Sequence, residues 1–185
     1  MNLKSFAHRS HQVFSHLLAV GRQRFARLGL AAAVGAEGDA HLRTLGATAR
    51  ARRAFAAAHP ADQASAARTA ASLRRLGAHV DDQLAALLHD LPKGHVALLP
   101  RVVHVLEGSP TTGRAQGLFA SSRQTLRRHA SAAPILATEL GAPKGTIAIL
   151  HELARLESAD ARRTATSKLG ARVQLLLDID SGVSR

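Results

Sequence analysis

Apolar residues recur along most of the chain at the three- and four-residue spacing of an amphipathic helix. The first stripe is basic on its opposite face, and its apolar members are Leu3, Phe6, Val13, Phe14, Leu17, Gly21, Phe25 and Leu28. We expect "GAEGDAH" (35–41) to break this helix, because glycine is unfavourable inside a helix. The pattern therefore predicts two units, a basic amphipathic N-terminal helix at 1–36 and an all-helical domain at 37–185.

Proline and glycine residues mark the expected ends of further helices in the rest of the chain. Pro60 suits a first helical turn, Gly77 suits a C-cap, and Pro92 ends a short apolar helix. No segment shows the strict alternation of a β-strand. The expected helices cover approximately residues 40–58, 60–76, 81–91, 95–108, 122–140, 143–160 and 161–180. The fold class that we predict is an all-α helical bundle.

Composition narrows the classes of protein that the chain can belong to. Hydrophobic residues make up 46% of the chain but aromatic residues only 3%, which favours a core of closely packed Leu, Val and Ala. The chain has no Cys, which excludes disulfides, thiolate metal sites and Cys nucleophiles. No apolar run approaches the roughly 20 residues of a membrane span. We therefore expect a cytoplasmic protein without a membrane-spanning helix.

The net charge of +12 predicts attraction to polyanions such as nucleic acid or phosphate-rich small molecules. There is no aromatic interleaving for base stacking, and no helix-turn-helix or RNA-recognition signature is present. The alternative is that these arginines form an ordinary solvated face. The candidate contacts to phosphate or nucleic acid are Arg68, Arg123, Arg127 and Arg128, with Lys93.

The stretch "ALLHDLPKG" (86–94) places two metal-capable side chains side by side at the end of an apolar helix. The imidazole of His89 and the carboxylate of Asp90 together suit a divalent ion of intermediate hardness. Lys93 follows closely enough to hold a phosphate oxygen. In isolation, the same residues also suit a helix C-terminus with a favourable His and a capping Asp.

The wider sequence resembles the HD superfamily of metal-dependent phosphohydrolases. "LAALLHDLPKG" is similar to the family signature Ala-Ala-Leu-Leu-His-Asp-(Ile/Val)-Gly-Lys, and the run before it resembles a small bacterial branch. "HASAAPILATELG" and "IAILHEL" resemble two later family helices, and the likeness extends over about 55–180. The resemblance implies an HD-like bundle that binds Mn, Fe, Zn or Mg through His89, Asp90, His129, His151 and Asp178.

In this interpretation Asp90 and Lys93 are the catalytic residues, and the substrate is a nucleotide or another phosphate ester. The closing acidic ligand falls in "LLLDIDSG", where Asp178 and Asp180 are both candidates. Asp160 is a weaker candidate for that position.

The departures from the family pattern bear directly on activity. Ser65 stands where the family has its first metal-binding His, and a hydroxyl is a poor ligand beside imidazole and carboxylate. Pro92 replaces the Gly of the signature, and Ala133-Pro134 replaces a later Gly-Ala.

An active hydrolase and an inactive descendant therefore both stay open, with a lean to the inactive form. The alternative function is a non-catalytic basic module that binds DNA, RNA or another polyanion. A homo-oligomer formed through the N-terminal helix is a third expectation.

Overall fold

The computed structural model describes residues 30–97, 99–101, 119–158 and 167–182, and within these ranges the chain is helical with no strand. The prediction of an all-α fold is thereby confirmed. The amphipathic stripe at 3–28 and most of the expected helix at 95–108 lie outside the described residues. The elements are α2 (Leu30–Thr44), α3 (Ala49–Ala56), α4 (Pro60–Arg75), α5 (Val80–Leu88), the 3₁₀ helix η1 (Leu91–Lys93), α7 (Ala120–Glu139), α8 (Lys144–Ser158) and α9 (Lys168–Asp180).

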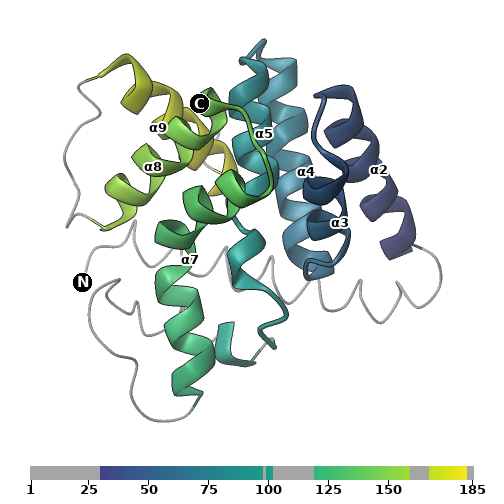
Figure 1. Cartoon of the computed structure of the whole chain (residues 1–185), viewed down its shortest axis with the longest axis vertical. Helices are drawn as coiled ribbons and strands as arrows, with labels where there is room; N and C mark the ends of the chain where they lie inside the picture. The colour runs from purple at the N-terminus through teal and green to yellow at the C-terminus, as the bar shows by residue number, and fades with distance from the viewer. Residues whose placement is uncertain (1–29, 98, 102–118, 159–166, 183–185) are drawn as a thin grey trace.

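Helix α5 lies in the middle of the bundle, and every residue from Asp82 to Asp90 is buried. Helices α4, α2 and α3 lie on one side of α5, and α8 and α9 lie on the other (Figure 1). Helix α7 packs against α8 and η1. The residues that directly follow α5 are therefore enclosed by other helices rather than by solvent.

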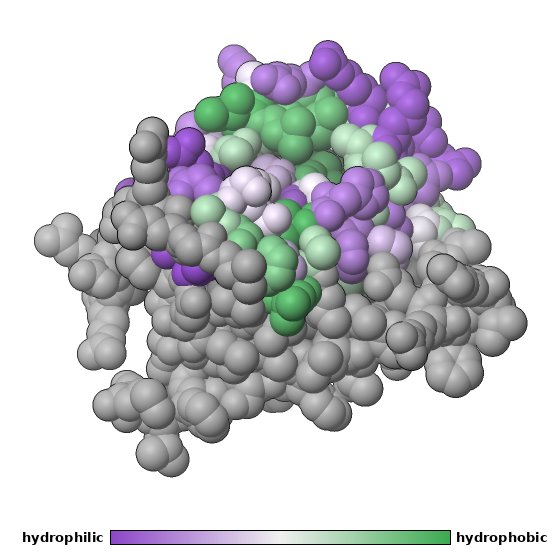
Figure 2. Space-filling model, turned by 90° about the horizontal axis from the view of Figure 1, so that it is seen from below, coloured by the Kyte–Doolittle hydropathy of each residue, from purple (hydrophilic) through white to green (hydrophobic). Residues whose placement is uncertain are grey.

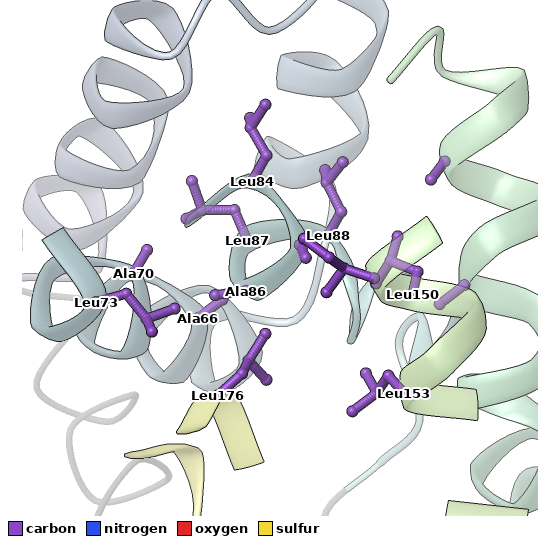
Figure 3. Packing of buried hydrophobic residues seen from close by; sticks show 14 of the residues in the cluster. Ala66, Ala70, Leu73, Leu84, Ala86, Leu87, Leu88, Leu150, Leu153 and Leu176 are labelled. Carbon is purple, nitrogen blue, oxygen red and sulfur yellow. The ribbon is translucent and has the colours of Figure 1, made fainter. Parts of the chain in front are cut away.

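The core around α5 is built from leucines that meet across alanines. Leu84, Leu87 and Leu88 of α5 belong to one buried cluster with Leu73 of α4, Leu150 of α8 and Leu176 of α9 (Figure 3). Each fully buried leucine contributes roughly 1.5–3 kcal/mol. The small alanines of α4 and α5 allow the two helices to approach closely, which is how a chain so poor in aromatic residues fills its interior.

The predicted helix break at 35–41 is wrong, because α2 runs through both of its glycines. The physical reason is packing: a Cβ atom on Gly38 would clash with the ring of the fully buried Phe55. Glycine is thus present in α2 to let α3 approach, not to end the helix. The helix ends at Thr44 instead, and Gly46 follows with φ of 74°. The predicted unit boundary at 36/37 consequently falls inside α2.

Other predicted boundaries agree better with the structure. Helix α4 begins at Pro60 and is followed by Gly77 at φ of 71°, as predicted. Helix α5 ends at Leu88, which places His89 and Asp90 in a turn before η1 rather than inside the helix. None of the described helices is both long enough and apolar enough to cross a bilayer.

A buried ion pair fastens the segment after η1 to α4. Arg101 binds Asp62 through two parallel bonds of 2.6 and 2.8 Å. The same guanidinium donates to the carbonyls of Val96 at 2.8 Å and Gly94 at 3.2 Å. Arg101 is only 2% exposed, so these partners replace its entire hydration.

We expect Asp62→Asn to destabilise the protein by about 3–5 kcal/mol, because it leaves the buried charge of Arg101 without its counterion. The measurement is the free energy of unfolding from urea denaturation. The control is Glu152→Gln, which breaks an exposed pair with Arg155 and should leave the midpoint of denaturation almost unchanged. Equal losses in the two variants would contradict this account of the pair.

Candidate functional site

His89 and Asp90 occupy the turn at the end of α5, where they are 5% and 7% exposed. Nδ1 of His89 donates a hydrogen bond of 2.9 Å to the carbonyl of Ala86, one turn back. This bond orients the ring, so that Nε2 points at the carboxylate of Asp90, 3.3 Å from its Oδ1. A backbone carbonyl bonded to one ring nitrogen is the usual arrangement in metal-binding histidines, because it leaves the other nitrogen free to coordinate.

His129 of α7 approaches the same carboxylate in the same manner. Its Nδ1 donates to the carbonyl of Leu126 at 2.7 Å. Its Nε2 lies 3.6 Å from Oδ1 of Asp90 and 3.9 Å from Oε2 of Glu157 on α8. Burial and the nearby charge of Lys93 lower the pKa of His129 to about 3. The ring is therefore neutral at pH 7, which is the state in which a histidine binds metal.

Asp180 reaches the group from the last residue of α9. Its Oδ2 lies 3.9 Å from Nε2 of His89. Its Oδ1 accepts a hydrogen bond of 3.1 Å from the hydroxyl of Thr69 on α4. We call His89, Asp90, Lys93, His129, Glu157 and Asp180 the central cluster. With Thr69, its residues come from α4, the turn after α5, η1, α7, α8 and α9.

Lys93 of η1 supplies the closest contact in the central cluster. Its Nζ lies 2.7 Å from Oδ1 of Asp90, and its side chain is 18% exposed. Burial lowers the pKa of Lys93, but Asp90 and Asp62 outweigh burial and raise it. Burial likewise raises the pKa of Asp90, but the charges of His89 and Lys93 outweigh it and hold that pKa well below its usual range. Asp90 is therefore an anion with a full positive charge beside it.

The donors fit a divalent ion in chemistry and nearly in spacing. Two ligands bound about 2.1 Å from one ion, at 90–109° to each other, lie about 3.0–3.4 Å apart. The separations from Nε2 of His89 to Asp90 and Asp180 are 3.3 and 3.9 Å. As folded, however, no group of three or more His, Asp or Glu side chains in the described ranges is arranged to hold a metal. Nζ of Lys93 also lies 2.7 Å from Oδ1 of Asp90, one of these donor atoms.

The structure does not bring every predicted ligand to this place. His151 is exposed on α8. Asp178 accepts a hydrogen bond of 2.7 Å from Gln174 on its own helix. Of the two acidic candidates near the C-terminus, Asp180 is the one in contact with His89. Ser65 lies on α4 one turn before Thr69, on the side of that helix that faces Asp180.

Glu157 and Thr69 were not predicted from the sequence. Glu157 continues the buried stripe of α8 that includes Leu150 and Leu153, so a carboxylate at an apolar helical position was the available signal. Burial raises the pKa of Glu157, and the negative charges of Asp90 and Asp180 act in the same direction. The signal for Thr69 was weaker, because threonine is common on helix faces of every kind.

The predicted polyanion contacts lie in differing environments. Arg68 on α4 and Arg128 on α7 are exposed, whereas Arg127 is half-buried and Arg123 is 8% exposed. On the face shown in Figure 2, hydrophilic residues of the described part lie toward the edge, with hydrophobic residues between them. That face is not continuously hydrophilic. Binding of nucleic acid through these arginines stays a prediction.

Comparison of the chain with protein-family models, with curated proteins and with solved structures gives no match.

The depressed pKa of His129 can be tested directly. In the metal-free protein we expect its ring to stay neutral from neutral pH down to about pH 4, because burial disfavours the imidazolium. Unfolding then takes up a proton, so this group makes folding less favourable as the pH falls from 6.5 toward 3. Nuclear magnetic resonance of the ring nitrogens measures the protonation state. Protonation of His129 near pH 6.5 would contradict the buried position described above.

Proposed function

We propose that the chain binds a divalent cation weakly at His89, Asp90, His129 and Asp180 and hydrolyses a phosphate ester there. The observation that carries the proposal is the convergence of His89 and His129 on one carboxylate oxygen, at 3.3 and 3.6 Å. These two residues are 40 positions apart, one in the turn after α5 and one on α7, and both come from motifs that resemble the HD superfamily. Asp180 supplies the acidic group that the resemblance expects near the end of the chain.

In this proposal some residues of the central cluster would bind the ion and others orient those ligands. His89 and His129 hold Nε2 toward Asp90 because backbone carbonyls bond their other ring nitrogens. Burial lowers the pKa of His89, but the carboxylates of Asp90 and Asp180 outweigh burial and raise it, so this ring must release a proton when an ion binds. Thr69 orients Asp180 through Oδ1 and leaves Oδ2 turned toward His89. A bound divalent ion would polarise the phosphoryl group and lower the pKa of a coordinated water. The class of substrate, a nucleotide or another phosphate ester, comes from the resemblance alone.

We expect weak binding of the metal because Ser65 stands where the resemblance expects a metal-binding His. This position lies on α4, one turn before Thr69. Even the loss of a group that only orients a ligand typically weakens metal affinity about 10–100-fold. The loss of a ligand itself should weaken it at least as much. The proposal is therefore an enzyme of reduced activity rather than a fully efficient one.

Replacing Ser65 tests this interpretation by a gain of function. We expect Ser65→His to tighten Mn²⁺ binding to the full chain about tenfold or more, because it restores a nitrogen ligand. Titration calorimetry of metal-stripped protein measures the affinity. The matched control is Thr44→His, at an exposed position of α2, a helix that contributes no residue to the central cluster, and it should leave the affinity unchanged. Equal effects of the two substitutions would show that Ser65 is not a ligand position.

Removing the carboxylate of Asp90 should abolish both metal uptake and phosphate release. Asp90→Asn is compared with His151→Gln, which changes an exposed histidine outside the central cluster and should retain both properties. The readouts are bound Mn²⁺ after dialysis and inorganic phosphate released from a panel of nucleotides. If wild-type protein and Ser65→His neither bind Mn²⁺ nor release phosphate, the proposal is wrong. The basic helical module would then be the interpretation to pursue.

A further inference from the structure

Oδ1 of Asp90 is the point on which the central cluster converges. Three nitrogen atoms surround it: Nζ of Lys93 at 2.7 Å, Nε2 of His89 at 3.3 Å and Nε2 of His129 at 3.6 Å. The ammonium group is the closest of the three. It therefore lies beside the oxygen that a metal ion bound by His89 and His129 would also contact.

The backbone that carries Lys93 is fixed by several interactions. Within η1, the amide of Lys93 bonds the carbonyl of Asp90 at 3.0 Å, and the amide of Gly94 bonds that of Leu91 at 3.1 Å. Arg101 then holds the carbonyl of Gly94 while it binds Asp62 on α4. The segment is thus attached at both ends to buried helices, which fixes the Cα of Lys93 within reach of Asp90.

Two cations cannot both occupy the immediate surroundings of one buried carboxylate oxygen without strong mutual repulsion. We propose that Lys93 is a built-in cation of the central cluster and that a divalent ion binds only by displacing its ammonium group from Asp90. Lys93 consequently lowers the affinity of the site for metal. It also stabilises the metal-free protein by placing a full positive charge beside a buried carboxylate.

This inference rests on the proposed function in one respect, namely that the central cluster takes a metal at all. It differs from the sequence-based expectation for Lys93, which was contact with a phosphate oxygen. The structure directs the ammonium group at Asp90, whereas contact with a phosphate requires only one of its other N–H donors. The two roles are therefore distinguishable, since one changes the affinity for the bare ion and the other changes only the affinity for a phosphate ester.

The test is Lys93→Met, which keeps the length of the side chain and removes its charge. We expect Mn²⁺ to bind the full-length variant at least about tenfold more tightly than wild type, measured by titration calorimetry. The metal-free variant should melt at a lower temperature than wild type. Added Mn²⁺ should raise the melting temperature of the variant more than that of wild type, because binding to the folded state stabilises it.

Two further variants keep the test decisive. Lys144→Met removes an exposed charge at the start of α8 and should leave Mn²⁺ affinity unchanged, which separates a local effect from a loss of net charge. Lys93→Gln removes the charge but retains a hydrogen-bond donor for Asp90. It is measured in the same way, so that a folding defect of the methionine variant does not end the experiment.

The outcomes separate the inference from the proposed function. Equal or weaker Mn²⁺ binding by both Lys93 variants, with binding by wild type, overturns the inference and leaves the metal site standing. Tighter binding by the variants supports both, even where binding by wild type is too weak to measure. No binding by wild type or by either variant overturns the proposed function, and the inference with it.

Discussion

The buried carboxylate of Asp90 is the charge around which the side chains of the central cluster are arranged. An ionised carboxylate is costly to bury unless positive or hydrogen-bonding partners replace water. Here the partners come from α5, η1 and α7, and a second carboxylate, Asp180, approaches from α9. The helices therefore meet around one charge as well as around a leucine core.

The cost of burying a charge also accounts for the exposure of the central cluster, which is buried at Asp90 and partly exposed at its edge. His89 and Asp90 are almost completely buried, whereas the side chains of Asp180 and Glu157 are 29% and 26% exposed. The acidic groups farthest from Asp90 are thus the ones that water reaches. The side chain of His129, 18% exposed, has an intermediate burial.

The sequence predicted most of the helices and the residues at the centre of the site, because both depend on local signals. Pro60 and Gly77 mark the ends of α4, and His89 with Asp90 directly follows an apolar run. The errors arose where distant contacts decide. Gly38 lies inside a helix because Phe55 packs against it, and Glu157 joins the cluster because of how α8 is rotated. The choice between Asp178 and Asp180 likewise depended on the rotation of α9, which no local pattern reveals.

The bond between Asp62 and Arg101 has a consequence for the motions of the protein. It joins positions 39 residues apart and encloses α5, η1 and the whole "HDLPK" stretch within one closed loop of chain. Fluctuations that open this loop must first separate a doubly bonded pair in a dry environment, so they are rare compared with ordinary fraying of helix ends. The amides of η1, which as an isolated turn would exchange with solvent quickly, inherit the slow exchange of the helix to which they are tied.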